Sequence, residues 1–520
     1  MGSMADESIG SEQALSPAAR LFHAPNFNCY IIAIIGCKTK ICPQVLKDGL
    51  QHTLLKQPRF SSKLVKKGRK VSWTPTTVNL DNHVITPEID TKSIDFPDQF
   101  VEDYISNFTR TPLDICKPLW EFHVLNIKTS DAESVGVFRI HHSIGDGASL
   151  ISLLLACTRK TTDPEVLPTT PTTKKRSTAT GSGNYSNMFC ACWVLLAIWR
   201  GLMFLWNTLV DLVLFVATIL FLKDSKTPLK GDLGVDLNTK RFVHRTVSLD
   251  DIKLVKNAMD MTINDVLLGI TQAGFTRYLN RTYSDDANRK ANNLPKSIRL
   301  RASILVNLRP TAGIQDLADM MAKNSKTGWG NWIGYIILPF TIALQDDPLE
   351  YIRQAKATID RKKHSFESVC TYWCARFVLN LFGTKVAATI TRRVLFNTTI
   401  AFSNVVGPQE EISFYGLPIT YLAPSVYGHP QALTIHYQSY INKMTISMAV
   451  DPNVISDPHL LCNDLEESLK LIPRCQLLKK ASLLILSSIE LYTDSVNLIE
   501  HLRNIFWERK TYTKQILLLD

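Results

Sequence analysis

The chain has 520 residues, of which 45% are hydrophobic and 20% are charged, and its formal net charge is +11. This length is too great for one ordinary core and suits a large two-part fold, and the composition allows the chain to bury real cores. A globular enzyme is the starting expectation. The positive charge favours an anionic partner: nucleic acid, a lipid headgroup surface or a phosphorylated substrate. No recognised nucleic-acid-binding motif accompanies it, which argues against a nucleic-acid partner.

The cysteines and the first residues indicate the compartment. Eleven cysteines are present, an odd number with no CxxC pair. We interpret them as reduced thiols in a chain that faces the cytosol, and we expect no zinc or other metal. The N-terminal stretch MGSMADESIGSEQ is polar and lacks an apolar core, so no signal peptide is expected.

Residues 1–160 are predicted to form an α/β lobe. Strand-like runs such as NCYIIAIIG and FHVLNI are separated by helical stretches such as CPQVLKDGLQHTLLKQ. Near its end, the strand-like SVGVFRI leads into HHSIGDG (residues 141–147), and the helix former ASLISLLLACT follows. The HHSIGDG cluster is therefore predicted to lie on a strand-to-helix connection.

Two unlike segments follow this lobe. Residues 161–187 are rich in Thr, Ser, Pro and Gly, and we predict a disordered linker there. Residues 188–222 are strongly apolar; the stretch after Arg200 carries Asp211 as its only charge and is long enough to span a bilayer. We predict that 188–222 is a membrane-associating segment.

The α/β pattern resumes over residues 240–473, which we predict to be a second lobe. Its strand-like runs include ASILVNL, TIAFSNVVG and KMTISMAV, and helices are expected near 262–280 and 348–363. Residues 474–520 mix apolar and charged runs without a readable motif, and we treat them as an atypical tail.

The HHSIGDG cluster has the residues of a general-base site. A neutral imidazole, with a reference pKa near 6.5, can take a proton from an alcohol, and His142 is the candidate. Asp146 lies near the start of the next helix, where it can cap backbone N–H groups or pair with an arginine, and Gly147 leaves room for a substrate. The alternative interpretation is that these residues are an ordinary strand end, N-cap and turn.

Several stretches together resemble one known family. In order along the chain they are QPRFSSKLV, PLDICKPLWEFHVL, HHSIGDGASLISLLLACTRK, TINDVLLG, VNLRP, GNWIGYIILPF, IDRKKHS and SNVVGP. HHxxxDG is similar to the active-site signature of the coenzyme A-dependent acyltransferase superfamily. Within it, the chain resembles the plant branch of the wax ester synthase/diacylglycerol acyltransferase family from about residue 18 to residue 473.

The resemblance implies a fold and a set of roles. The fold would be a two-lobed α/β structure like chloramphenicol acetyltransferase, with an active-site tunnel between the lobes and the apolar segment as an insertion. His142 would be the base, His141 its support, and Asp146 would point away from substrate into an ion pair for which Arg309 is a candidate. Ser403 or Asn404 are candidate donors to the oxyanion, with strand packing as their alternative role.

Three further residues are interpreted mainly as support. Asn264 and Asp265 begin a predicted helix that Thr262 or Asn264 could cap, so we expect them to support the fold or tunnel rather than to catalyse. Trp120, in the PLW element, is interpreted as a core aromatic residue, with tunnel lining as the alternative.

The resemblance also implies substrates and location. Long-chain acyl-CoA would be the donor substrate, without a separate cofactor, and a fatty alcohol the acceptor, giving wax esters; diacylglycerol is a further acceptor. Membrane lipid would be a partner, and the endoplasmic reticulum membrane, or also the plasma membrane, the location, with the lobes facing the cytosol. The basic runs 63–70 and 361–363 are candidates for binding headgroups or CoA phosphates, or are ordinary solvated faces.

Two alternatives stay open. A soluble acyltransferase of the BAHD type, acting on a small alcohol, fits less well because its late DFGWG element is absent here. An inactive membrane-tethered relative would keep the fold but is disfavoured by the intact motif.

A single crossing by the apolar segment would place the two predicted lobes on opposite sides of a bilayer. We therefore expect either a re-entrant hairpin that turns at Arg200–Gly201 or an in-plane anchor, with basic flanks on the cytosolic side. Asp211 would be costly in lipid and also argues against a simple span. The alternative is a buried amphipathic helix.

Overall fold

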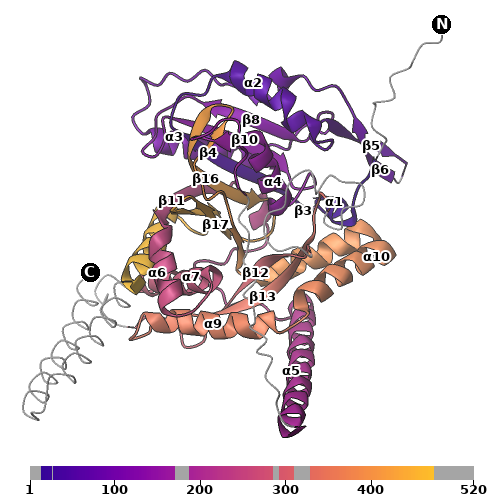
Figure 1. The fold of residues 1–520 in the computed structure, drawn as a ribbon, viewed down its shortest axis with the longest axis vertical. Helices are drawn as coiled ribbons and strands as arrows, with labels where there is room; N and C mark the ends of the chain where they lie inside the picture. Colours follow the sequence, from indigo (N-terminus) through magenta and orange to yellow (C-terminus); the bar gives the residue numbers. More distant parts are fainter. Residues whose placement is uncertain are drawn as a thin grey trace, which may run out of the picture. The chain divides into compact units, whose positions relative to one another are not determined.

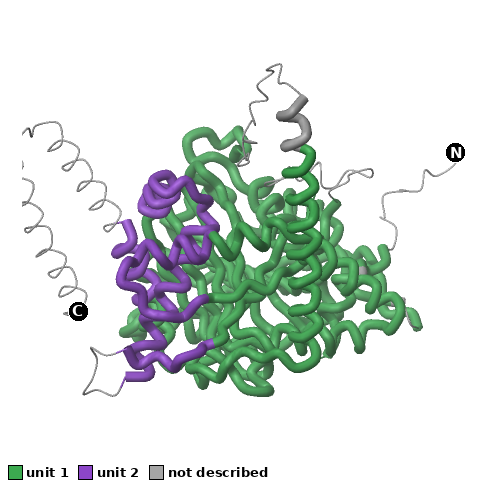
Figure 2. The backbone as a smooth tube through the Cα atoms, turned by 90° about the horizontal axis from the view of Figure 1, so that it is seen from below, with its two compact units in different colours: residues 1–249, 299–340, 357–462 green, residues 250–298, 341–356, 463–520 purple. Residues whose placement is uncertain are grey.

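The computed structural model describes residues 13–25, 27–68, 70–169, 187–284, 292–309 and 328–473. Most of the predicted linker and the whole 474–520 tail lie outside this described part. The chain divides into two compact units, residues 1–249, 299–340 and 357–462, and residues 250–298, 341–356 and 463–520 (Figure 2). The larger unit contains two large sheets, the basis of the predicted two-lobed α/β fold (Figure 1).

The first sheet has seven strands in the order β10-β15-β16-β4-β9-β8-β7. Its central strand β4 pairs antiparallel with both β9 and β16, so the apolar run after Asn28 is buried among strands on both sides. Strands β15 and β16 come from the second predicted lobe, so that part of the chain completes the first sheet. The strands are β4 Tyr30–Cys37, β7 Val84–Ile85, β8 Trp120–Leu125, β9 Ser134–His141, β10 Thr158–Lys160, β15 Ile412–Phe414 and β16 Leu417–Tyr427.

Three helices share one hydrophobic core with this sheet: α2 (Pro43–His52), α3 (Pro97–Asn107) and α4 (Gly147–Cys157). Trp120 is at the centre of that core; it is fully buried, and its indole N–H donates to the Phe60 carbonyl at 2.9 Å. The interpretation of Trp120 as a core residue is confirmed. The predicted strands and helices of residues 15–160 are all present as elements of the predicted type.

The second sheet has six strands in the order β11-β18-β17-β14-β12-β13. Its middle strand β14 is parallel to both β12 and β17. In β14, Ile400 and Phe402 are buried, whereas the other residues of the strand are only half-buried. The strands are β11 Arg241–Ser248, β12 Arg299–Asn307, β13 Ile333–Thr341, β14 Ile400–Val405, β17 Leu433–Tyr440 and β18 Lys443–Val450.

Short elements complete the larger unit. Helix α1 (Pro17–Leu21) is followed by the two-stranded ribbon β2 (His23–Ala24) and β3 (Phe27–Asn28). A small sheet contains β1 (Gln13–Ala14), β5 (Ser62–Lys67) and β6 (Lys70–Pro75). The 3-10 turns are η1 Leu54–Lys56, η2 Leu80–Asn82, η3 Phe108–Arg110 and η4 Val235–Leu237.

The apolar segment forms one continuous helix, α5 (Asn187–Leu220). The hairpin expected to turn at Arg200–Gly201 is therefore wrong: the helix runs through both residues. A glycine inside a helix costs only about 1 kcal/mol, which the strong helix formers around it offset. Among the described residues, α5 is the helix long and apolar enough to cross a membrane, over Val194–Leu220.

The second half of α5 packs against the protein through polar groups. Asp211 is fully buried and accepts from Arg361 and Lys362, both at 2.8 Å. Lys362 also pairs with Glu367 at 2.6 Å. Lys363 pairs with Asp360 at 3.4 Å, so all three basic residues at 361–363, interpreted as candidates for binding headgroups or phosphates, are engaged with carboxylates of the chain itself.

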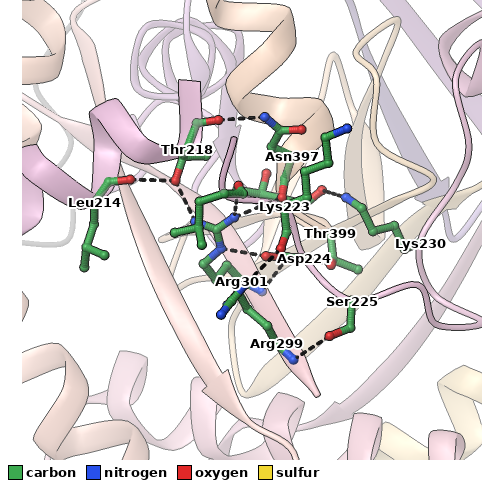
Figure 3. A network of polar contacts seen from close by, with 12 residues as sticks. Leu214, Thr218, Lys223, Asp224, Ser225, Lys230, Arg299, Arg301, Asn397 and Thr399 are labelled. Carbon is green, nitrogen blue, oxygen red and sulfur yellow. Dashed lines mark hydrogen bonds and ion pairs between the residues drawn. The ribbon is translucent and has the colours of Figure 1, made fainter. Parts of the chain in front are cut away.

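A buried network fixes the C-terminal end of α5 (Figure 3). Arg301 of β12 donates to Asp224 at 2.6 Å, to the Thr218 hydroxyl at 2.6 Å and to the carbonyls of Leu222 and Asn397. The second carboxylate oxygen of Asp224 accepts from the Thr399 hydroxyl at 2.6 Å. The guanidinium therefore joins the end of α5 to β12 and to the residues that precede β14.

Two helices follow β13 along the chain. Helix α9 (Leu349–Lys363) begins in the smaller unit and ends in the larger, and α10 (Glu367–Asn397) is interrupted at Gly383, whose φ is 81°. The smaller unit is helical, with most of α6 (Leu249–Ala258) and all of α7 (Ile263–Thr282). In α7 a Cβ at Gly269 would lie 2.7 Å from the Ile352 backbone, so close packing there requires glycine.

Candidate active site

The ring of His142 lies at the wall of a cavity of about 300 Å³ in the larger unit. The residue follows β9 directly and precedes α4, as predicted for a strand-to-helix connection. Its N–H donates to the Cys29 carbonyl at 2.9 Å, and its carbonyl accepts from the Asn331 amide at 3.0 Å. The imidazole stacks on Phe22, with centroids 4.3 Å apart. Backbone and ring are thus both held in place.

Burial keeps His142 neutral. It lowers the pKa of the imidazole below 6.5, and the residue's own carbonyl, the Asp146 charge and the Asn331 side chain offset part of that effect. A neutral imidazole has a lone pair available to accept a proton at neutral pH.

His141 points away from the cavity. Its ring nitrogens bond to the Ser143 hydroxyl at 2.7 Å and the Asn28 side-chain oxygen at 2.8 Å, and the ring stacks on His23 with centroids 4.1 Å apart. Successive side chains of an extended segment alternate faces, which explains why the two adjacent histidines have different surroundings. His141 thus contacts the loop through Ser143, and its supporting role stays a prediction.

Asp146 is held in the buried ion pair predicted for it. Its carboxylate accepts from the Arg309 guanidinium at 2.8 Å, the Trp332 N–H at 2.9 Å and the Ser149 N–H at 3.0 Å. The last bond makes it the N-cap of α4, the Trp332 bond holds the 330–332 segment, and the Arg309 bond holds the segment after β12. All three bonds join the buried carboxylate to the chain itself.

Gly147 is the first residue of α4, and the packing of the protein does not itself require glycine there. A Cβ on Gly147 would have the Val405 side chain as its nearest neighbour, at 3.8 Å, an ordinary contact. Gly147 is not among the residues that line the cavity.

The remaining predicted residues fall in different places. Ser403 of β14 lines the cavity, whereas the neighbouring Asn404 is not among its lining residues. Asn264 and Asp265 lie in the smaller unit, where Thr262 caps α7 and Asp265 closes a capping box with it. Thr262 rather than Asn264 is therefore the N-cap. Asp265 has the structural role that the sequence favoured.

Sequence reasoning missed two histidines that line the same cavity. His436 of β17 is paired in register with Ser403, and His429 bonds through Nε2 to the Thr434 hydroxyl at 2.8 Å. Burial lowers the pKa of His429 to about 3 and that of His436 to about 4. The alternation of polar and apolar residues in TIHYQS was a usable signal, because it places Thr434, His436 and Gln438 on one face of the strand.

Most of the other cavity walls are apolar or weakly polar. They come from α1 and the residues after it, from the ends of β12 and β14, and from α10. Arg59 is a cation at the wall, and burial lowers its pKa to about 10. Representative apolar lining residues are Leu21, Phe27, Leu305, Leu379, Leu395 and Phe402.

Two family models match the chain. The wax ester synthase/diacylglycerol acyltransferase catalytic domain matches residues 42–267, and the WS/DGAT C-terminal domain matches residues 329–473. The chain belongs to the wax ester synthase/diacylglycerol acyltransferase family. Wax ester synthase/diacylglycerol acyltransferase 5 of Arabidopsis thaliana is 56% identical to it over 475 residues, covering 89% of this chain and 93% of the relative. Number 6 from the same plant is 54% identical over 490 residues, covering 90% and 94%.

Solved structures agree on the fold of this family. The wax ester synthase/diacylglycerol acyltransferase from Marinobacter aquaeolei VT8 matches with a TM-score of 0.56 at 17% identity, covering 89% of this chain and 99% of that one. The starter condensation domain of rhizomide synthetase, solved in complex with C8-CoA and Leu-SNAC, matches with a TM-score of 0.50 at 11% identity, covering 92% and 97%. The predicted two-lobed α/β fold is confirmed.

Proposed function

We propose that this acyl-CoA-dependent O-acyltransferase works in the cavity described above, with His142 as the general base. The observation that carries the proposal is the buried, neutral imidazole of His142 at the wall of a largely apolar cavity. His142 takes the proton of the acceptor hydroxyl while the hydroxyl oxygen attacks the thioester carbonyl of acyl-CoA. The tetrahedral intermediate then collapses with loss of the C–S bond, and the proton passes from His142 to the departing thiolate.

The oxyanion of that intermediate needs hydrogen-bond donors close to the carbonyl. Ser403 is the better placed of the two candidates, because it lines the cavity and Asn404 does not. His436, in register with Ser403 on the next strand, supplies a second polar group to the same wall. Asp146 and Arg309 are positioning residues: their ion pair holds the loop that carries His142.

The acceptor class follows from the family and from the cavity wall. Relatives at 56% and 54% identity are named wax ester synthase/diacylglycerol acyltransferase, and the cavity walls are mostly apolar. A long-chain alcohol is the acceptor we propose first, and diacylglycerol the second. Long-chain acyl-CoA is the donor and enters as a substrate.

The setting we propose is a membrane surface, with the endoplasmic reticulum as the location and the site on its cytosolic side. Support comes from α5, which is strongly apolar and mostly exposed over Val194–Leu220. The second half of α5 is packed on the protein through Asp211 and Thr218, which supports an attached helix with one lipid-facing side.

The test is expression of the full chain in a yeast strain that lacks neutral-lipid synthesis, supplied with fatty alcohol, followed by lipid analysis. His142→Ala should lower wax ester production by about 10²–10⁴-fold, the usual contribution of a general base. The matched control is His83→Ala, because His83 is an equally buried histidine in the core beside Trp120. Undiminished ester from His142→Ala contradicts the assignment of the base; triacylglycerol without wax ester favours diacylglycerol as the acceptor.

A further inference from the structure

Helix α10 consists of two halves that meet at a break at Gly383. Each half lines the cavity with one face, on which the lining positions recur every three or four residues. They are Thr371, Tyr372, Ala375, Arg376 and Leu379 before the break, and Ala387, Thr391 and Leu395 after it.

The first half of α10 also carries a row of exposed apolar side chains away from the cavity face. Trp373, Phe377, Leu381 and Phe382 are between 56% and 62% exposed, values unusual for side chains of this size. Single exposed apolar residues are ordinary, whereas contiguous ones mark an interaction surface. We call this group the α10 stripe; it consists of Phe366 at the N-cap of α10, Val369, Trp373, Phe377, Leu381 and Phe382 in its first half, and Val386 after the break.

The α10 stripe is continuous with α5. The ring of Phe366 lies edge-on to Phe204 of α5 with centroids 4.4 Å apart, and its N–H donates to the Thr208 hydroxyl at 3.0 Å. From Val194 to Leu220, α5 is itself exposed along most of its apolar side chains. The two helices therefore present one joined apolar surface.

The orientation of the two helices is fixed by buried polar contacts. Lys362 joins Asp211 of α5 to Glu367 in the first turn of α10. At the other end, Asn397 donates to the Thr218 carbonyl at 2.6 Å, within the network of Arg301 and Asp224 (Figure 3). Both ends of α10 are thus attached to α5.

The charges on this surface have a single sign. On the described parts of α5 and α10, the exposed charged residues are Arg200, Arg376, Lys385 and Arg393. The acidic residues of the two helices, Asp211 and Glu367, are buried and paired with Lys362. Apolar side chains rimmed by cations match a lipid surface with anionic headgroups. A second copy of the same surface would bring like charges together.

We propose that the α10 stripe lies in the membrane interface beside α5, and that the acceptor lipid enters the cavity from the bilayer alongside α10. The placement of the stripe in the membrane interface rests on the surface alone, and the entry of the acceptor from the bilayer rests on the proposed function. Arg376 connects the two faces, because it is exposed, lines the cavity and lies over the Trp373 ring at 5.2 Å. The cavity wall thus includes an exposed residue that contacts the stripe, and an apolar acceptor that enters there avoids passage through water.

The experiment measures partition of the full chain onto phosphatidylcholine vesicles with and without phosphatidylserine, at a lipid concentration that binds half of the parent protein. The triple variant Phe377→Ser, Leu381→Ser, Phe382→Ser should lower the partition coefficient by at least about tenfold. The matched control is Phe96→Ser, Leu233→Ser, Leu237→Ser, which removes apolar side chains that are 72–86% exposed on other parts of the chain. The control should change partition by less than about twofold.

Two results would overturn the proposal: equal loss in both triple variants, or unchanged vesicle partition of the stripe variant. If the stripe variant with unchanged partition also loses self-association, the stripe is assigned to a second copy. Thermal unfolding of both variants checks that each is folded. Because partition is measured without substrate, a chain that makes no ester still tests the stripe. Conversely, if the chain makes ester normally and the stripe variant partitions onto vesicles like the parent protein, this inference is wrong and the proposed function is retained.

Discussion

Asp146 and Arg309 lie 163 positions apart in the sequence and form a buried ion pair of 2.8 Å directly behind the loop that carries His142. The guanidinium also donates to the Gly330 carbonyl and the Ser149 hydroxyl. The pair thus joins the start of α4 to the loop before β13. The aspartate of HHxxxDG therefore has its ion-pair partner in the distant VNLRP stretch.

Replacing Asp146 by Ala should destabilise the protein by about 3–5 kcal/mol, because removal of one partner leaves a buried guanidinium unpaired. The N-cap of α4 is lost as well, at a cost of about 1 kcal/mol. Denaturant unfolding measures both effects. Glu133→Ala, which breaks the exposed Lys128–Glu133 pair, is the control and should cost less than about 1 kcal/mol. Equal losses would contradict the structural role of Asp146.

The pH dependence of kcat/KM should show an acid limb below pH 6.5. Burial lowers the pKa of His142, so the neutral, basic form persists on acidification beyond the ordinary histidine midpoint. Activity falls only when the imidazole is protonated. Rate measurements from pH 8 to pH 4.5 with a detergent-dispersed alcohol test this. A midpoint above pH 6.5 would contradict a buried neutral base.

Stability should fall as pH drops from 6.5 towards about 4. His23, His429 and His436 have pKa values lowered by burial to about 4, 3 and 4, whereas in the unfolded chain each titrates near 6.5. Below pH 6.5 these histidines bind protons in the unfolded state but not in the folded state, so protonation favours unfolding. Each such histidine contributes a slope of about 1.4 kcal/mol per pH unit. His436→Gln should flatten the slope; an unchanged slope would exclude its contribution.

Gly147→Ala should leave stability unchanged and reduce activity. The added methyl group has its nearest neighbour at 3.8 Å, and alanine favours the helix over glycine. If substrate passes beside Gly147, the methyl group blocks it, and kcat/KM should fall at least about tenfold, or about 1.4 kcal/mol. Gly36→Ala is the contrasting variant, because its Cβ would lie 2.3 Å from the Tyr421 ring and should impair folding. Full activity of Gly147→Ala would show that substrate does not approach there.

Arg301→Lys should loosen the end of α5. A lysine cannot reproduce the planar set of donors that serves Asp224, Thr218 and two carbonyls together. We expect a loss of about 2–4 kcal/mol and faster proteolysis around residues 221–226. Arg299→Lys on the same strand is the control, since the Arg299 side chain makes one long bond, 3.3 Å, to the Lys223 carbonyl. Similar behaviour of the two variants would contradict this account of the network.

Much of the local structure was predictable because it depends on neighbouring residues. Alternating apolar runs gave β4 and β9, Thr262 and Asp265 gave the start of α7, and the spacing in HHSIGDG placed His142 after a strand. The hairpin at Arg200–Gly201 failed because an arginine and a glycine do not break a helix among strong helix formers. His429 and His436 were missed because their importance depends on which strands lie beside the cavity.

The sequence by itself determined the strand-to-helix loop of the motif, the apolar segment and the family, since each is written in adjacent residues or in their order. Only the tertiary structure decided that β15 and β16 complete the first sheet, that Arg309 pairs with Asp146, and that α10 has a cavity face and an apolar exposed face. The physical reason is that burial, ion pairing and exposure depend on contacts between distant segments. Local periodicity constrains which face of an element is apolar, but it does not specify what that face meets.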